Sequence, residues 1–214
     1  MQKNSFFKKG AEAELTEEIF CGKLVLSKKR IPKSYRAPGL DLLIRKTRTR
    51  SEAKILRDVS FAINVPDVIK VDENNAEILM EFIPGKRLKE VIEKKPLLAK
   101  EAGKLIRKIH DLGIIHGDLT TSNIIFVDEN EIKQNEELLK RVKKKGNLFF
   151  IDFGLGFYSK KVEDRATDLV VFKKTFNATH SSLKKGWKLV MEGYNPDKEL
   201  HTRMEAIEKR ARYH

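Results

Sequence analysis

Cysteine is almost absent from this sequence, because Cys21 is the only one among 214 residues. One thiol cannot form an intramolecular disulfide framework or a cysteine-based zinc site, so we expect a reducing, intracellular compartment. The sequence also lacks an apolar run close to the roughly 20 residues that span a bilayer. Its first ten residues are polar and basic without an apolar core segment. We therefore expect a soluble chain that is not exported and has a cytoplasmic location.

Acidic residues are too few to balance the basic ones. The chain has 44 Lys and Arg against 31 Asp and Glu, a formal net charge of +13. The excess is concentrated from Lys28 to Arg57, where eleven basic residues against two acidic ones give +9. This cluster indicates a polyanionic partner, although a solvated surface explains it about equally well. Hydrophobic residues make up 40% of the chain, enough for one core or two small lobes.

Two polar motifs in the second half of the chain have the spacing of a kinase active site. His116-Gly117-Asp118 is followed by Asn123, as in the catalytic loop H-R-D-x-x-x-x-N, and Asp152-Phe153-Gly154 comes later. Phosphoryl transfer needs one carboxylate to orient the attacking oxygen, with an amide and a second carboxylate holding Mg²⁺ on the phosphates. Chance tripeptides are the alternative. Apolar runs flank both motifs and predict buried strands: Ile114-Ile115, Ile124 to Phe126 and Leu148 to Ile151.

Three strands are expected near the N-terminus, at Ser5 to Lys9, Leu15 to Phe20 and Leu24 to Lys28. In a kinase the first turn covers the nucleotide phosphates with a G-x-G-x-x-G loop, but here Gly10 stands alone. A plain hairpin with one glycine in the left-handed conformation is the alternative.

Lys28 ends the third strand, where a kinase carries the lysine that contacts the α- and β-phosphates. Because side chains alternate along a strand, Lys28 and Lys29 must face opposite sides, so the assignment depends on register. The expected partner of Lys28 is Glu52, which lies in a helical stretch with Ile55 and Leu56 on its apolar side. An exposed glutamate among arginines is the alternative.

Two further strands, Val65 to Val71 and Ala76 to Ile83, would complete a five-stranded sheet. The residues from Glu81 to Ile83, followed by Pro84-Gly85, are typical of a hinge whose backbone meets an adenine edge. Met80 would lie at the entrance of that hinge, and core filling explains a methionine there equally well.

The remaining sequence predicts helices. One runs from Pro96 to Gly113, and the charged segment Asp128 to Asn147, with five acidic and six basic residues, is expected to be a partly helical surface excursion. A helix from Asp164 to Phe176 places Asp168 among apolar residues, where a carboxylate must be paired, so we expect it to hold the catalytic-loop backbone. The last helices are expected at Ser181 to Gly193 and Pro196 to Arg212, with a basic end at Lys209-Arg210-Ala211-Arg212.

The fold class that these elements predict is α+β, with two lobes like those of a protein kinase. Residues 1–83 would form a small lobe with a five-stranded sheet and the helix carrying Glu52, and residues 84–214 a reduced helical lobe. Only 60 residues follow Gly154 (214 − 154), and no A-P-E signature occurs among them. We therefore expect no long peptide-docking elements and no phosphate-switched activation loop.

Taken together, these motifs resemble the small atypical kinase/ATPase of the KEOPS complex, the archaeal and eukaryotic machinery that makes threonylcarbamoyladenosine in tRNA. The resemblance implies a two-lobed kinase fold that binds Mg-ATP and works attached to the tRNA-modifying subunit, with the other small KEOPS subunits and tRNA as further partners. It also implies ATP hydrolysis, or serine/threonine phosphorylation of itself or other proteins. The matching segments are G-A-E-A at 10–13, K-K-R-I-P-K-S-Y-R-A-P-G-L-D at 28–41, R-S-E-A around Glu52, I-I-H-G-D-L-T-T-S-N at 114–123, I-D-F-G at 151–154 and D-L-V-V at 168–171.

Site roles follow from the resemblance residue by residue. Asp118 would be the base or nucleophile-orienting residue, Asn123 and Asp152 would hold Mg²⁺, and Lys28 with Glu52 would form the phosphate-anchoring pair. The nucleotide would also contact Gly10, Ala11 and Glu12 of the phosphate loop and Met80, Glu81 and Ile83 of the hinge.

Two departures from protein kinases weaken a protein-kinase interpretation and leave ATP hydrolysis open. Gly117 stands where an arginine would bind an activation-loop phosphate, and Thr120 where a lysine usually approaches the γ-phosphate. A small-molecule phosphotransferase of the antibiotic-kinase type also uses an H-G-D loop, but the basic 28–57 segment and the short C-terminal lobe argue against it. A kinase-shaped RNA-binding scaffold is the third hypothesis, and the intact Asp118, Asn123 and Asp152 argue against that one.

Overall fold

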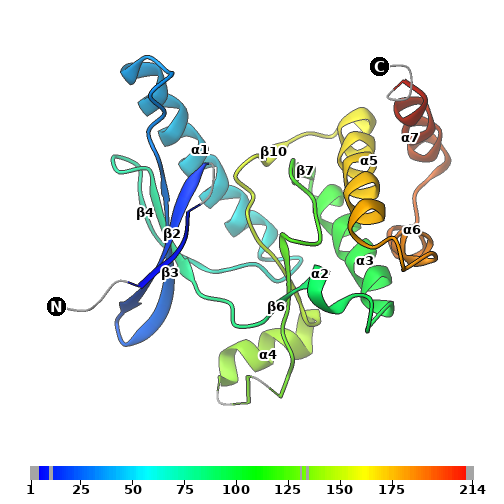
Figure 1. Cartoon of the computed structure of the whole chain (residues 1–214), viewed down its shortest axis with the longest axis horizontal. Coiled ribbons are helices and arrows are strands. Elements are labelled where there is room, and N and C mark those ends of the chain that lie inside the picture. The colour runs from blue at the N-terminus through cyan, green and yellow to red at the C-terminus, as the bar shows by residue number, and fades with distance from the viewer. Residues whose placement is uncertain (1–4, 10–11, 131, 134, 211–214) are drawn as a thin grey trace.

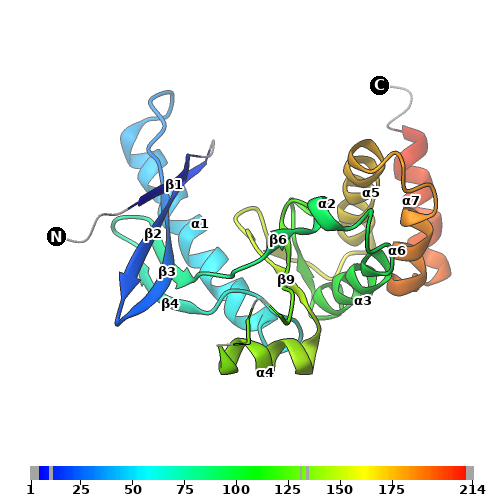
Figure 2. The same cartoon turned by 60° about the horizontal axis from the view of Figure 1, so that its bottom comes forward.

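The computed structural model describes residues 5–9, 12–130, 132–133 and 135–210, and the basic end at 211–212 therefore lies outside the described residues. An antiparallel five-stranded sheet with strand order β1-β2-β3-β5-β4 forms one end of the molecule, and helices dominate the other end (Figures 1 and 2). This arrangement agrees with the α+β prediction. The strands of the sheet are β1 (Ser5–Lys9), β2 (Ala13–Phe20), β3 (Lys23–Arg30), β4 (Val68–Asp72) and β5 (Glu77–Glu81).

Helix α1 (Pro38–Val59) follows the sheet strand β3 through the loop 31–37. Pro38 occupies the first helical turn, where its missing N–H costs nothing, and the preceding Ala37 is extended with ψ 134°. The helix then packs its C-terminal half inward, because Glu52, Ile55 and Val59 are all buried. Its first turns project beyond the sheet, as Figure 1 shows at the upper left.

Strand β3 is longer than the sequence prediction, which ended it at Lys28. It continues to Arg30. Strands β2 and β3 pair without a bulge, from Ala13 opposite Arg30 to Phe20 opposite Lys23. The longer strand places a second basic side chain on the same face as Lys28, two residues further along.

Short strands and helices form the remainder of the chain. Helix α3 (Leu97–Asp111) packs closely on α6 (Gly186–Tyr194). A Cβ added at Gly103 would lie 2.0 Å from the Val190 carbonyl oxygen, so only glycine permits this approach. None of the helices in the described ranges is long and apolar enough to cross a membrane. The elements are β6 (Lys86–Arg87), α2 (Leu88–Val91), α3 (Leu97–Asp111), β7 (Ile114–Ile115), β8 (Ile124–Phe126), α4 (Glu136–Lys145), β9 (Leu148–Phe150), β10 (Phe157–Tyr158), α5 (Val162–Thr179), α6 (Gly186–Tyr194) and α7 (Lys198–Arg210).

The charged segment 128–147 is more than the surface excursion expected from its sequence. Its helix α4 buries Leu138 and Val142 in a small core with Phe149 and Ile83. Arg141 of the same helix bonds Glu81 Oε2 at 2.6 Å and also reaches the Val65 carbonyl oxygen. The expected helix around Leu138 and Leu139 is present, but the segment is not only a surface excursion, because two apolar residues in a highly charged helix are enough to anchor one face.

Candidate active site

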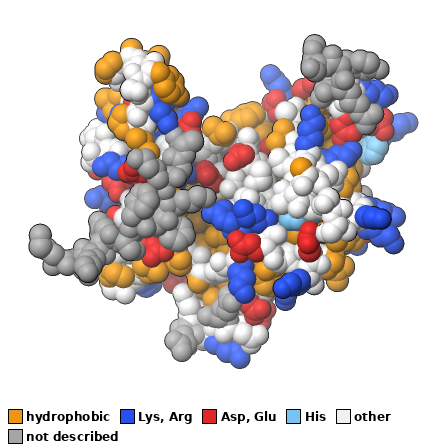
Figure 3. Space-filling model, in the orientation of Figure 1, with side chains coloured by type: hydrophobic (Ala, Val, Ile, Leu, Met, Phe, Trp, Pro, Cys, Tyr) orange, Lys and Arg blue, Asp and Glu red, His pale blue; other side chains and the backbone are white. Residues whose placement is uncertain are grey.

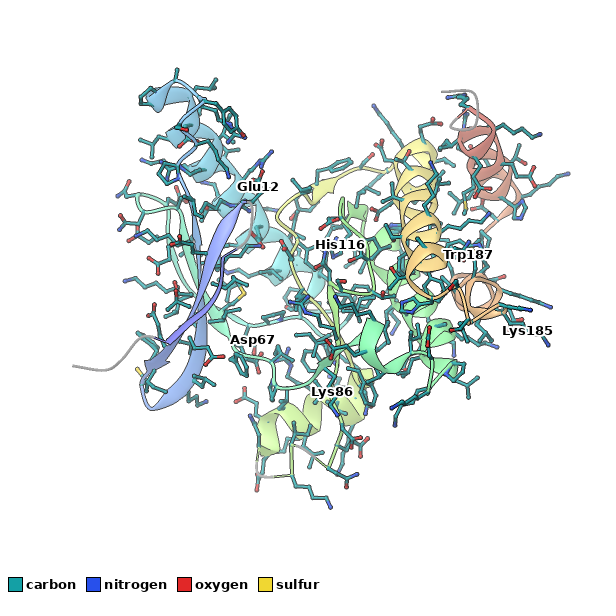
Figure 4. All side chains as sticks on the ribbon, in the orientation of Figure 1. Glu12, Asp67, Lys86, His116, Lys185 and Trp187 are labelled. Carbon is teal, nitrogen blue, oxygen red and sulfur yellow. The ribbon has the colours of Figure 1, made fainter. Side chains whose placement is uncertain are left out.

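A cleft of about 390 Å³ lies between the sheet and the helical part, a volume in the range of small-molecule sites. Figure 4 places Glu12 on the sheet side and His116 on the helical side. Gly10 and Ala11 lie outside the described residues. All other residues predicted for the site line this cleft: Glu12, Lys28, Glu52, Met80, Glu81, Ile83, Asp118, Asn123 and Asp152.

Lys28 points into the cleft and Lys29 points out, as the predicted register requires. Lys28 is 8% exposed, and its Nζ lies 2.6 Å from Glu52 Oε1 and 2.6 Å from Asp152 Oδ1. Burial by itself lowers the pKa of Lys28, but the two carboxylates more than reverse this and raise it, so the ammonium is charged at neutral pH. The ion pair expected between β3 and α1 is therefore present.

Asp152 is the second carboxylate on Lys28. Its side chain is 48% exposed, and its Oδ1 also accepts a hydrogen bond from the Gly154 backbone N at 3.3 Å. Burial raises the pKa of Asp152, but Lys28 and the Gly154 N–H outweigh it and hold the pKa below its usual range. The backbone of Asp152 has φ 63°, a left-handed conformation that is rare outside glycine and is found at functional sites.

Asn123 connects the two halves of the catalytic-loop motif. Its Nδ2 donates to the Asp118 carbonyl oxygen and to Asp118 Oδ2, both at 2.9 Å. Because these two hydrogen bonds use the amide nitrogen, the Asn123 Oδ1 atom is left to bind other groups. Asp118 itself is exposed to the cleft, where a base or orienting residue must be accessible to its substrate.

The donor set fits Mg²⁺. Carboxylate and amide oxygens are the ligands that this ion prefers, and it commonly takes one or two from protein and the rest from phosphates and water. Asn123 Oδ1 and Asp152 can supply them, since the Asn123 nitrogen is already bonded to Asp118. Within the described ranges no group of three or more His, Cys, Asp or Glu is placed to hold a metal, so phosphate oxygens would have to complete the coordination.

Asp168 of α5 holds the catalytic-loop backbone, as predicted. Its Oδ2 accepts from the His116 N at 3.1 Å, and its Oδ1 accepts from the Gly117 N at 3.0 Å. Oδ2 also lies 3.2 Å from His110 Nε2, whose other ring nitrogen bonds the Tyr194 hydroxyl. Burial raises the pKa of Asp168, but His110 and these bonds prevail and lower it, so the carboxylate is ionised.

Asp168→Asn is expected to loosen the catalytic loop, because the new amide has one acceptor oxygen for two backbone N–H groups. Hydrogen bonds to a buried charge contribute about 2 kcal/mol, which corresponds to a melting temperature lower by about 4–8 °C for a chain of this size. Turnover should fall while ATP affinity changes little, since Lys28 lies on the sheet. Thermal melts and ATP titration measure both quantities. Glu163→Gln, on the exposed side of the same helix, is the control, and an equal loss there would contradict the prediction.

Gly117 cannot be replaced by the arginine of protein kinases on this backbone. It has φ +79°, and an added Cβ would lie 2.3 Å from the Leu155 carbonyl oxygen. The neighbouring His116 is buried, which lowers its pKa despite three nearby aspartates and keeps the ring neutral. Its Nε2 donates to the Ile151 carbonyl oxygen at 3.2 Å, so the histidine joins the two motifs. Thr120, by contrast, contributes its carbonyl oxygen to the Asn123 N–H.

The end of the cleft beside β5 is apolar. Met80 and Ile83 are each 6% exposed, and both interpretations of Met80 apply, because it lines the cleft and also packs with Ala53. The apolar walls come from both parts of the chain, and alternation along β3 places Leu26 on the same side as Lys28. Sequence reasoning missed the other members of these walls: Ala13 and Leu15 from the sheet, and Ile125 and Ile151 from the helical part. The alternation of side chains along the strands is the sequence signal that could have identified these apolar residues.

Arg30 was also missed. It lines the cleft, is 4% exposed, and places Nη2 2.7 Å from Glu52 Oε2. The strand alternation that turns Lys28 inward also turns Arg30 inward, so the signal was present once the strand was extended by two residues.

The basic segment 28–57 is largely paired in space. Arg48 lies 2.6 Å from Glu12, Arg50 lies 2.5 Å from Glu73, and Arg45 lies 2.7 Å from the buried Asp41. In Figure 3 the basic side chains are spread over the visible face, and the projecting end of α1 is mostly apolar. Asp41 is already counted in the local charge of +9, and three acidic residues from outside the segment, Glu12, Glu73 and Asp152, offset about a third of it.

The sheet, the lysine–glutamate pair and the two polar motifs at one cleft define a protein of the kinase-like class. A family model described as the RIO domain matches residues 30–133. A solved structure, the Rio2 kinase-ADP/Mg²⁺-phosphoaspartate complex from Chaetomium thermophilum, matches 97% of this chain and 70% of its own with a TM-score of 0.65. At 15% identity this likeness concerns the fold alone, and it confirms the predicted fold class.

Sequence relatives identify the family. The KEOPS complex subunit Bud32 of Pyrococcus abyssi is 38% identical over 225 residues, covering 96% of this chain and 94% of that protein. The chain belongs to the family of this subunit, which confirms the resemblance seen in the motifs. A probable bifunctional tRNA threonylcarbamoyladenosine biosynthesis protein of Methanobrevibacter smithii is 41% identical over 213 residues. The match covers 96% of this chain but only 36% of that longer protein.

Proposed function

We propose that this chain is a Mg-ATP-dependent atypical kinase or ATPase that acts as a KEOPS subunit in threonylcarbamoyladenosine modification of tRNA. The main observation for this chemistry is that Lys28 Nζ lies 2.6 Å from both Glu52 Oε1 and Asp152 Oδ1. Asp118 and Asn123 line the same cleft. Lys28 would bind the α- and β-phosphates, with Glu52 holding its ammonium in place. The hinge residues Met80, Glu81 and Ile83 and the segment containing Gly10, Ala11 and Glu12 would complete the nucleotide site.

Asp118 is proposed to orient the attacking hydroxyl or water and accept its proton. Asn123 fixes the Asp118 carboxylate through Nδ2, so the acceptor oxygen is positioned before substrate arrives. Asn123 and Asp152 would hold Mg²⁺, which neutralises charge on the phosphates when bound. The name of the solved Rio2 complex includes ADP and Mg²⁺, which supports a nucleotide and Mg²⁺ as the cofactors of this fold.

Partners are proposed from the relatives. One relative is named as a KEOPS complex subunit, and others are named bifunctional biosynthesis proteins of which this chain matches about a third. We propose that a tRNA-modifying subunit does the work of the remaining part, that the other small KEOPS subunits and tRNA join in the assembly, and that it works in the cytoplasm. We also propose that the two lobes meet after Ile83, where β5 has just ended.

Pull-down with the tRNA-modifying subunit, followed by phosphate-release assays with and without it, tests this function. We expect co-purification and Mg²⁺-dependent ATP turnover that changes severalfold on assembly. Co-purification without any turnover, alone or assembled, would favour a kinase-shaped scaffold. Turnover on a small hydroxylated metabolite without co-purification would favour a small-molecule phosphotransferase.

The basic segment gives a separate prediction about tRNA. Arg50→Glu with Arg57→Glu, both exposed on α1, should weaken tRNA binding or assembly without changing ATP affinity. The log-log salt slope should fall by about 0.7–0.9 for each phosphate contact removed. Arg45 and Arg48 are left intact because they bond the buried Asp41 and the cleft residue Glu12. Lys143→Glu with Lys144→Glu, exposed residues of α4, makes the same charge change and is the control. Equal tRNA affinities for the 28–57 double variant and the α4 double variant would mean that the basic segment is only a solvated surface.

A further inference from the structure

Four charged side chains form one cluster at the inner end of the cleft: Lys28, Arg30, Glu52 and Asp152. Lys28 Nζ lies 2.6 Å from one oxygen of Glu52 and 2.6 Å from Asp152 Oδ1. Arg30 Nη2 lies 2.7 Å from the other oxygen of Glu52. Two cations and two carboxylates give the cluster a formal charge of zero.

Arg30 is poorly explained as a structural residue. Its side chain is 4% exposed, and its Nε is a buried donor with no hydrogen-bond partner among the described residues. A buried guanidinium with an unmet donor weakens folding, and an apolar side chain of similar length would avoid that cost. A buried arginine with this cost therefore points to a role in the site.

Arg30 also determines how Glu52 is shared. Because Arg30 binds Oε2, only Oε1 is left for Lys28. Without Arg30, both oxygens could turn to Lys28, and the cluster would carry a formal charge of −1 at the point where anionic phosphates must enter. The bond from Arg30 would keep Glu52 attached to β3 when Lys28 turns to the phosphates. Gly154 leaves room for this, since an added Cβ would lie 3.0 Å from Arg30 Nη2.

We propose that Arg30 is a positioning residue for the nucleotide. It holds Glu52 and offsets one of the two negative charges of the cluster, so that Lys28 is free to bind the phosphates. This inference rests on the proposed ATP site and goes beyond it, because it gives the site a second cation that acts through Glu52.

ATP titration by calorimetry, with and without Mg²⁺, tests the proposal together with thermal melts. Arg30→Gln and Arg30→Met should each bind ATP about tenfold more weakly, the scale of one charge-assisted hydrogen bond. Arg30→Lys keeps the charge and should stay within about threefold of the wild type. Lys29→Gln, which faces outward on the same strand, should bind ATP like the wild type.

A double-mutant cycle tests whether Arg30 acts through Glu52. In a Glu52→Gln background, Arg30→Gln should change ATP affinity by less than about threefold, because its target charge is gone. An undiminished effect in that background would overturn the proposal, and so would wild-type affinity in either neutral variant. Failure of both neutral variants to fold, with normal affinity in Arg30→Lys, would also overturn it in favour of a structural role. If the wild type does not bind ATP, the proposed function fails instead.

Discussion

Replacing Asp152 with asparagine is expected to abolish Mg²⁺-dependent ATP turnover. An amide cannot replace the anionic ligand that joins metal and phosphates, and Asp152 is the carboxylate of the proposed ligand pair, in which Asn123 is neutral. The structure adds a second reason, because the Asp152→Asn change would leave Lys28 with one carboxylate partner instead of two. Phosphate release at saturating ATP over a Mg²⁺ series measures the effect.

Asp118→Asn is the companion variant and should behave differently. Asp118 lies on the catalytic loop, and the carboxylates that hold Lys28 are Glu52 and Asp152, so nucleotide binding should stay nearly intact. Turnover should fall by about a hundredfold or more, the usual scale for a positioned acid or base. Near-normal turnover in both variants would contradict the kinase or ATPase function.

Lys28→Ala should raise the ATP concentration needed for half-maximal turnover by about tenfold or more. The ammonium contacts both Glu52 and Asp152, and its loss leaves two carboxylates with only Arg30 beside them, a formal charge of −1 that repels the phosphates. Truncating one partner of a buried ion pair also lowers the stability of the fold. A thermal melt is therefore needed beside the ATP titration, to separate lost stability from lost affinity.

Lys29→Ala is the control that strand alternation supplies. Lys29 is exposed on the opposite face of β3, and its removal should change neither ATP affinity nor melting temperature. Sensitivity at Lys29 with a normal Lys28→Ala variant would mean that the register of β3 is shifted by one residue.

Local pattern predicted most of the site. The spacing from Asp118 to Asn123, the D-F-G motif and the alternation around Lys28 each describe residues that are neighbours along the chain, and their geometry follows from strand and loop periodicity. The pairing of Lys28 with Glu52 could also be predicted, because Glu52 is the only glutamate between Lys28 and Arg57 and lies on a helix with an apolar stripe. The roles of these residues stay predictions until the variants are measured.

The paired state of the basic segment could not be predicted, because Glu12 and Glu73 reach Arg48 and Arg50 only after the sheet has formed. Helix α4 is a similar case. Its composition is typical of a solvated surface, and the burial of Leu138 and Val142 depends on Phe149 and Ile83, which other segments supply.

The sequence by itself determined the kinase-like class, the order of its motifs and the face of β3 that carries Lys28, since these depend on short-range periodicity and residue chemistry. Only the tertiary structure decided which charges neutralise one another. The contacts of Arg30 with Glu52 and of Asp152 with Lys28 join residues 22 and 124 positions apart. Coulomb interactions depend on distance in space, and no pattern along the chain specifies that distance.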